Sequence, residues 1–203
     1  MLSIDFLVNS DKQRTLTEAV GIETGLMRAT FAQHTAAKLK ERYDAVLTPG
    51  NSFGHMTGGF DLGVVEVFGR PVQAAVLKMI KEKYNGMMPV GSAEVVVVDG
   101  KAIVYIPTMM VPTSFTDPIA PYMAMHQGLR ALALHMAETD TFFARLVCPL
   151  FCTGTGTIDP ETALYQQNQA LVEFQLAKHG DDIGCSDLFN DGTERYMKLI
   201  EKR

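Results

Sequence analysis

Two glycine-containing segments carry residue types that suit the binding of a phosphorylated ligand. The first, residues 51–61, follows a short apolar run and contains an asparagine, the pair Gly58-Gly59 and an aspartate. Glycines lack a Cβ atom, so their backbone N–H groups can come close to an anion. Asn51 and Asp61 can hydrogen-bond hydroxyl groups or water at one end of such a ligand. This segment therefore predicts a phosphate-binding loop with an amide and a carboxylate beside it.

The second segment, residues 151–160, also follows an apolar run and contains Gly154-Thr155-Gly156. It lacks both the ending of a P-loop and the spacing of a dinucleotide-binding fingerprint. Taken alone, either glycine pattern is more often only a turn. Together, at the carboxyl ends of two predicted strands, they predict an anion-binding cleft, because ligands of open α/β sheets bind at that edge.

Alternating strand and helix patterns predict an α/β fold with a mixed, mostly parallel sheet and helices on both faces. Asp99-Gly100 predicts a tight turn between two antiparallel strands. Residues 26–32 fit a strand, but they could also begin one long helix that ends at residue 43. The expected strands are residues 2–8, 26–32, 45–47, 93–98, 102–106 and 146–150, and the expected helices are residues 11–20, 35–43, 61–68, 72–83, 118–138 and 160–178.

Composition predicts one domain over residues 1–203. Of the 203 residues, 47% are apolar and 20% are charged, and the formal net charge is −5. This length fits one α/β domain with a single substantial core. Residues 181–203 form a polar extension, in which a short helix from Thr193 to Arg203 is expected, capped by Thr193.

Charge and hydropathy exclude several functional classes. Acidic and basic residues are interspersed, whereas a nucleic-acid-binding face needs clustered Lys and Arg. The densest basic stretch, residues 78–83, is expected on the solvated side of a helix. No apolar run reaches the ~20 residues of a membrane span, and residues 1–5 do not begin a signal peptide. We therefore expect a cytoplasmic protein that binds neither nucleic acid nor membrane.

The cysteines and histidines predict no disulfide framework, metal site or cofactor. Cys148, Cys152 and Cys185 have no framework spacing, which favours reduced thiols. Cys152 borders the second glycine segment and is a minor alternative as a nucleophile. No spacing among the five histidines suits a zinc site.

At these segments the chain resembles the macrodomain family, whose members bind ADP-ribose and some of which hydrolyse ADP-ribose conjugates. The resemblance covers roughly residues 1–180. It rests on three segments that occur in the same order as in the family. Residues 44–51 resemble the family's strand that ends in asparagine, residues 56–61 its first glycine-rich loop, and Gly154-Thr155-Gly156 its second. The spacing of ten positions from the asparagine to the aspartate of residues 51–61 resembles that of MacroD-type hydrolases. Residues 89–94 and 106–112 resemble segments of a macrodomain-like subgroup.

The resemblance implies roles for residues of both segments. Gly58, Gly59 and the amides of residues 153–156 would hold a diphosphate, and Asn51 would hydrogen-bond the distal ribose. Asp61 would activate a water or hold that ribose; as an alternative it could only cap a helix over residues 62–68. The site residues implied are Asn51 and Asp61 as catalytic groups, with Ser52, Phe53, Met56, Thr57, Gly58, Gly59, Thr153, Gly154, Thr155, Gly156 and Thr157 as ligand-binding groups.

Some positions depart from the family pattern. Gln33-His34-Thr35 stands where many macrodomains carry a Gly-Asp pair whose aspartate contacts adenine. Gly58 stands where DNA-directed macrodomain hydrolases place a lysine, so a route through an amine nucleophile is not expected.

The resemblance implies a protein that binds ADP-ribose or a derivative and hydrolyses a conjugate, either an ADP-ribosylated protein or O-acetyl-ADP-ribose. Two alternatives use the same cleft: a non-catalytic ADP-ribose-binding module, and a phosphatase acting on ADP-ribose 1''-phosphate. A structural protein with a relic pocket is a third, and it predicts no nucleotide binding.

Overall fold

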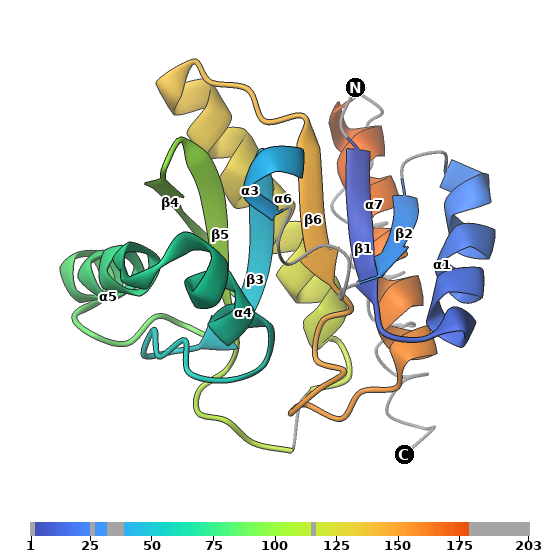
Figure 1. The fold of residues 1–203 in the computed structure, drawn as a ribbon, viewed down its shortest axis with the longest axis horizontal. Helices are drawn as coiled ribbons and strands as arrows, with labels where there is room; N and C mark the ends of the chain where they lie inside the picture. Colours follow the sequence, from blue (N-terminus) through green and yellow to red (C-terminus); the bar gives the residue numbers. More distant parts are fainter. Residues whose placement is uncertain (1–2, 25–26, 32–38, 115–116, 179–203) are drawn as a thin grey trace.

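One six-stranded sheet organises the part of the chain that the computed structural model describes, which is residues 3–24, 27–31, 39–114 and 117–178 (Figure 1). The strand order is β2-β1-β6-β3-β5-β4. All neighbouring strands are parallel except β4 and β5. The strands are β1 (Ser3–Val8), β2 (Met27–Phe31), β3 (Ala45–Asn51), β4 (Glu94–Val98), β5 (Lys101–Met109) and β6 (Arg145–Pro149). The predicted mixed, mostly parallel sheet is confirmed.

Helices cover both faces of this sheet, as the sequence predicts. Helices α1, α6 and α7 pack on one face, whereas α3, α4 and α5 pack on the other (Figure 1). The helices are α1 (Asp11–Thr24), α3 (Leu39–Arg42), α4 (Gly59–Phe68), α5 (Arg70–Tyr84), α6 (Ala120–Thr139) and α7 (Pro160–Lys178). None of the helices that the structure describes is both long enough and apolar enough to cross a lipid bilayer.

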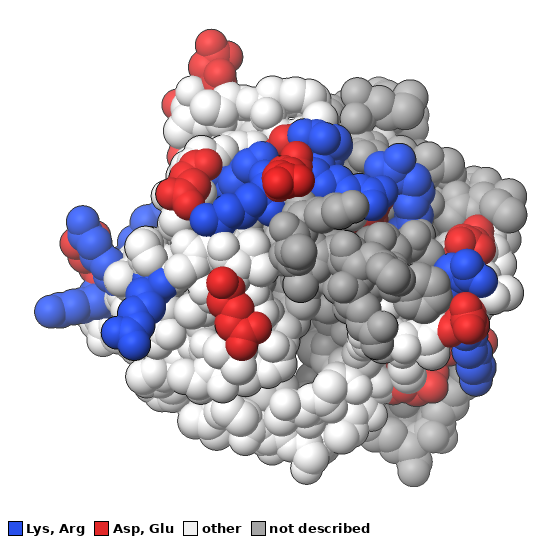
Figure 2. Space-filling model, viewed as in Figure 1, with Lys and Arg blue, Asp and Glu red and all other residues white. Residues whose placement is uncertain are grey.

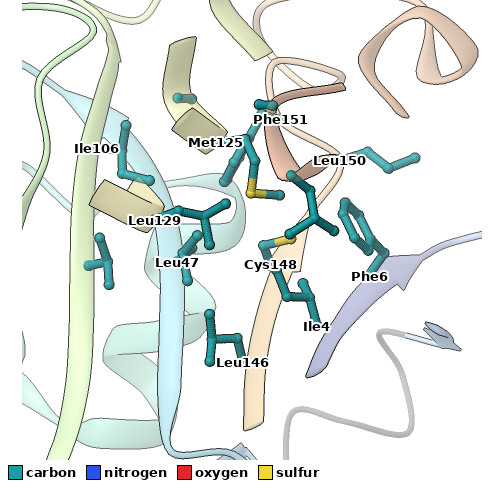
Figure 3. Close-up of a cluster of buried hydrophobic side chains, with 14 of the residues drawn as sticks. Ile4, Phe6, Leu47, Ile106, Met125, Leu129, Leu146, Cys148, Leu150 and Phe151 are labelled. Atoms are coloured by element: carbon teal, nitrogen blue, oxygen red, sulfur yellow. The ribbon is translucent and has the colours of Figure 1, made fainter. Parts of the chain in front are cut away.

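The two faces bury two separate apolar clusters, because successive residues of a strand point to opposite sides of the sheet. Phe6 and Leu47 belong to the cluster under α6 and α7, which Figure 3 shows together with Met125 and Leu129. Val46 belongs to the cluster under α4 and α5. Residues 102–108 of β5 are buried without interruption, as expected for a central strand covered on both faces.

The hairpin between β4 and β5 is confirmed. Val98 pairs with Lys101 in an antiparallel ladder. Asp99 and Gly100 between them have φ angles of 51° and 71°. Two consecutive left-handed residues suit the twist of a two-residue hairpin turn, and the Asp-Gly pair favours that conformation.

Several boundaries differ from the expected ones. Strand β3 continues to Asn51 instead of ending at residue 47, and α4 begins at Gly59 instead of residue 61. The helices α4 and α5 are separated only by Gly69, whose φ of 84° turns the chain. Of the strand expected over residues 26–32, Met27–Phe31 form β2, and of the helix expected over residues 35–43 only α3 is described. Residues 33–38, which include Gln33-His34-Thr35, and residues 181–203, with the helix expected there, lie outside the described part of the chain.

Strands β3 and β6 are neighbours that separate before they end. They pair only at Ala45–Leu146 and Val46–Val147. Beyond this point each strand carries a proline, Pro49 and Pro149, which cannot donate a hydrogen bond to a ladder. The separation opens the carboxyl edge of the sheet between the loops that follow the two strands.

Candidate functional site

A cleft of about 600 Å³ occupies this separation at the carboxyl edge of the sheet. Ligands of open α/β sheets bind at such an edge, and the volume lies within the range of small-molecule sites. The cleft lies between two glycine-containing loops. The first loop follows β3, and the second loop (residues 150–157) follows β6. The lining of the cleft is Leu7, Asn9, Gln13, Leu39, Pro49, Gly50, Asn51, His55, Thr57, Gly58, Gly59, Phe60, Asp61, Gly63, Thr108, Met109, Pro112, Pro149, Leu150, Cys152, Thr153, Gly154, Thr155 and Gly156.

The N-terminus of α4 forms one wall of the cleft. Its N-cap residue is Gly58, which is extended and provides no side-chain cap. The backbone N–H groups of Gly59 and Phe60 have no acceptor among the described residues, as expected for the first turn of an uncapped helix. Such N–H groups, together with the helix dipole, attract anions. The side chain of Asp159, by contrast, accepts a hydrogen bond from Thr162 N at 3.0 Å and so caps α7.

The second loop forms the opposite wall. The backbone N–H groups of Thr153, Gly154, Thr155 and Gly156 have no acceptor within the described part of the chain. A Cβ atom added to Gly58, Gly59 or Gly154 would meet no atom of the described residues within 4 Å. The glycines therefore leave open space next to the backbone on both walls, which is the arrangement that lets an anion contact N–H groups directly.

Helix α7 fixes the beginning of the second loop. The side chain of Gln167 is fully buried, accepts a hydrogen bond from Phe151 N at 2.8 Å and donates one to Pro149 O at 3.1 Å. Cys152 and Thr157, near the two ends of the loop, have φ angles of 63° and 57°. Left-handed backbone is uncommon outside glycine and persists where the surrounding contacts fix it. The loop is thus held in one shape rather than left to adapt.

Asn51 lies at the end of β3 and lines the cleft, but its carboxamide also organises its own loop. Nδ2 donates to His55 O at 2.7 Å, and Oδ1 accepts from Phe53 N at 3.0 Å. An amide nitrogen carries two donors, so one N–H of Nδ2 is left for a ligand in the cleft.

Asp61 stands in the first turn of α4, with only 6% of its surface exposed. Its Oδ1 atom has no hydrogen-bond partner among the described residues. Burial raises the pKa of this carboxyl to about 6, although backbone N–H groups, with that of Leu62 first, partly oppose the shift. Because the N-cap of α4 is Gly58, the alternative of Asp61 as an N-cap is wrong. A carboxyl group of this kind can accept a proton near neutral pH.

The Lys and Arg side chains of the described residues lie outside the lining of the cleft. Figure 2 shows Lys and Arg across the upper part of the molecule, above a lower part that is largely uncharged. Ion pairs join Asp5 to Arg28 and Asp44 to Arg145 and Lys101, at or near the amino ends of the strands. No Lys or Arg is part of the described lining of the cleft. The attraction for an anion there must come from backbone N–H groups. The basic stretch at residues 78–83 lies on α5 with its lysines exposed, as expected.

The structure brings most of the predicted site residues together. Those in the lining are Asn51, Asp61, Thr57, Gly58, Gly59, Thr153, Gly154, Thr155 and Gly156. Ser52, Phe53, Met56 and Thr157 are not in the lining. Met56 packs into the core under α4, Ser52 is buried with its carbonyl accepting from Met88 N at 2.9 Å, and the Thr157 hydroxyl donates to Ser114 O at 2.8 Å.

Sequence reasoning missed one end of the cleft, formed by Leu7, Asn9, Gln13 and Leu39. The side chains of Leu7 and Leu39 are almost fully buried, whereas Asn9 is exposed. Leu7, Asn9 and Gln13 join the site because β1 lies beside β6. No local pattern marks that neighbourhood, since it depends on the order of strands in the sheet.

The two cysteines in the described part of the chain, Cys148 and Cys152, are poor nucleophiles. Burial raises the pKa of the Cys152 thiol to about 12 and that of Cys148 well above its usual range. A thiol is reactive as its thiolate, so the minor alternative of Cys152 as a nucleophile loses its support. Within the described part of the chain, no group of three or more His, Cys, Asp or Glu side chains is placed to hold a metal ion.

Comparison with known proteins agrees with this geometry. Residues 23–116 match the family model of a Macro-like domain. The structure is similar to the macrodomain of DarG from Mycobacterium tuberculosis, with a TM-score of 0.52 and 21% sequence identity over 67% of this chain and 86% of that chain. It is also similar to the Oceanobacillus iheyensis macrodomain with ADP, with a TM-score of 0.55 and 16% identity over 80% of this chain and 87% of that chain.

The chain has a macrodomain fold. The resemblance stated from the glycine segments is therefore confirmed, and at these identities the solved structures establish the fold alone. The macrodomain of DarG from Thermus aquaticus is a further similar structure, with a TM-score of 0.50 and 18% identity over 66% of this chain and 85% of that chain.

Proposed function

We propose that the cleft binds ADP-ribose or a derivative of it. The observation that carries this proposal is the pair of facing amide walls, one at the N-terminus of α4 and one in the second loop, with no Lys or Arg in the described lining. A diphosphate carries charge on both phosphoryl groups and suits two separate sets of N–H donors. The similar Oceanobacillus iheyensis macrodomain, which was solved with ADP, supports this ligand class.

The two ends of the cleft suit the two ends of such a ligand. The distal ribose would lie beside Asn51 and Asp61, where a free amide N–H and a carboxylate oxygen can bind hydroxyl groups. The nucleoside would lie toward Leu7, Leu39 and Gln13. Aliphatic side chains can pack on the faces of a base, and amide groups can pair with its edge.

Hydrolysis of an ADP-ribose conjugate is the finer part of the proposal. One carboxylate oxygen of Asp61 has no partner within the described part of the chain, and the pKa of the carboxyl is about 6, so near neutral pH it is mostly ionised and can take a proton from water. In this role it would direct a water molecule onto the anomeric carbon of the distal ribose, with a protein side chain as the leaving group. For an acetyl ester of ADP-ribose the water would instead attack the acyl carbon, with the ribose hydroxyl as the leaving group and acetate as the product.

One observation favours a second candidate, a non-catalytic ADP-ribose-binding module. The carboxamide of Asn51 is already bonded to Phe53 and His55. A carboxamide held by these hydrogen bonds can give a binding site a fixed shape. It cannot easily reorient to make a stronger contact with the transition state than with the substrate, which catalysis requires.

Isothermal titration calorimetry with ADP-ribose and AMP tests the binding proposal. We expect ADP-ribose to bind at least about 10-fold more tightly than AMP, because only the diphosphate reaches both amide walls and the Asn51 end. Equal affinities, or no binding of either nucleotide at millimolar concentration, would leave the macrodomain resemblance as a statement about fold alone.

A further inference from the structure

A buried tyrosine lies beneath the corner at which β3 leaves the sheet and enters the cleft. Tyr105 belongs to β5 and is completely buried in the apolar cluster under α4 and α5. Its hydroxyl donates to Asn51 O at 2.8 Å and accepts from Asn51 N at 3.0 Å. A single side chain 54 positions away thus binds both backbone groups of the residue that presents its carboxamide to the cleft.

These two hydrogen bonds occur where the strand ladder is irregular. Gly50 pairs with Pro107, but the next residue, Asn51, pairs with Met109, so Thr108 is bulged out of the register. A bulge interrupts the regular ladder, and Pro107 has no N–H group to contribute. The Tyr105 hydroxyl, which is both donor and acceptor, supplies hydrogen bonds to the backbone at this point.

Gly50 makes this contact possible. A Cβ atom at Gly50 would lie 2.3 Å from the hydroxyl oxygen and 2.4 Å from Cζ of Tyr105. Atoms cannot remain that close, so any side chain at position 50 would displace the ring or the strand. The glycine is therefore needed for space. Gly50 and Tyr105 form one packing unit directly under Asn51.

The unit also borders the carboxylate side of the site. Burial, and to a smaller extent the charge of Asp61, raise the pKa of the Tyr105 hydroxyl, which keeps it protonated and able to donate to Asn51 O. The Asn51 carboxamide in turn bonds to His55 O and Phe53 N. Hydrogen bonds thus connect Tyr105 in the core to Asn51, and Asn51 to His55 in the lining of the cleft.

We propose that Tyr105 is a positioning residue, which through the backbone of Asn51 sets the direction of the Asn51 carboxamide for the distal part of the ligand. Gly50 is the partner that allows the ring to lie there. This inference rests on the proposed function, because it names how one end of the ADP-ribose site is held. Tyr105 itself is buried below the site and touches no ligand.

Tyr105→Phe is the direct test, because it removes one oxygen atom and keeps the ring. We expect the variant to bind ADP-ribose about 10-fold more weakly in calorimetry, since the buried N–H and C=O of Asn51 lose their hydroxyl partner and the corner shifts. Tyr43→Phe is the matched control. Tyr43 is also buried in the same cluster and donates to Asp5 Oδ2 at 2.6 Å. Neither Tyr43 nor Asp5 is part of the cleft lining. The affinity of Tyr43→Phe for ADP-ribose should stay within about twofold of wild type, even if the variant is less stable to heat.

A double variant separates positioning from general stability. In an Asn51→Ala background, Tyr105→Phe should weaken ADP-ribose binding by less than about threefold, because the carboxamide that Tyr105 positions is gone. The Nδ2 resonances of Asn51 in the ligand-free protein should shift in Tyr105→Phe and stay unchanged in Tyr43→Phe, which tests the same claim without a ligand.

The possible outcomes distinguish this inference from the proposed function. Wild-type binding of ADP-ribose that is unchanged in folded Tyr105→Phe, or Asn51 Nδ2 resonances that do not move, would overturn the positioning role and leave the binding function standing. An equal loss of affinity in Tyr43→Phe would reduce Tyr105 to a structural residue. A wild-type protein that does not bind ADP-ribose would overturn the proposed function itself.

Discussion

Gly154→Val is expected to weaken ADP-ribose binding by at least about 100-fold while the protein remains folded, because its side chain would separate a phosphate from at least one charge-assisted backbone hydrogen bond and fill its space. A Cβ atom at Gly154 would meet no atom of the part of the chain that the structure describes within 4 Å, and the φ angle of Gly154 is not left-handed. The substitution should therefore weaken ligand binding and leave the thermal stability of the protein nearly unchanged. Calorimetry with ADP-ribose, beside a thermal unfolding curve, measures both effects.

Variants at other positions make this result interpretable. Gly58→Val should act in the same way on the opposite wall, since Gly58 is extended and its Cβ would also meet open space. Gly59→Val is a poorer test, because its φ of 61° would strain a branched residue whatever the ligand does. Ala74→Val, exposed on α5, is the control for valine at the surface of the protein. Unchanged affinity in folded Gly154→Val would show that the second loop lies away from the ligand.

Asp61→Asn is expected to lower the turnover of an ADP-ribosylated protein or of O-acetyl-ADP-ribose by about 10²-fold or more, the scale of a lost general base. Asparagine keeps the shape of the side chain at the start of α4 but cannot take a proton from water. Binding of ADP-ribose should change much less than kcat. In contrast, Asn51→Ala should weaken binding and turnover together, since its carboxamide would hold the ribose in the ground and transition states alike.

The pH dependence of the wild-type rate gives the same hypothesis a second test. The base must be ionised, so kcat/KM should fall as the pH drops through the pKa of Asp61, about 6, and should be flat above about pH 7. Glu66→Ala, at an exposed carboxylate on the same helix, should leave the rate unchanged. Wild-type rates in Asp61→Asn would exclude a catalytic role for Asp61. ADP-ribose binding without release from any conjugate would favour the non-catalytic module.

Much of the fold could be predicted because its determinants are local. The Asp-Gly turn at residues 99–100 needs only its two residues to reverse the chain, and α7 begins at Pro160 as expected. The two glycine segments could be placed on one cleft because parallel strands end at the same edge of a sheet. The direction of the strands is enough to place both segments at this edge, and the order of the strands is not needed.

The remaining features depend on contacts between distant residues. Strand β3 continues through Pro49 and Gly50, beyond the expected end at residue 47, because β5 pairs with it along its whole length. The contribution of Leu7 and Gln13 to the cleft follows from the position of β1 beside β6. Tyr105 looks like an ordinary core residue in the sequence, and only the bulge above it gives its hydroxyl a partner.

A titration of the ¹⁵N-labelled protein with ADP-ribose, followed by backbone amide resonances, is the most direct test of whether the two amide walls hold the diphosphate. We predict the largest shifts at Gly58, Gly59 and Phe60 on one wall and at residues 153–156 on the other, with smaller shifts at Asn51. No shift at millimolar ADP-ribose would contradict the claim. So would shifts confined to other residues, such as Val90 and Met123 of the smaller pocket between β5 and α6.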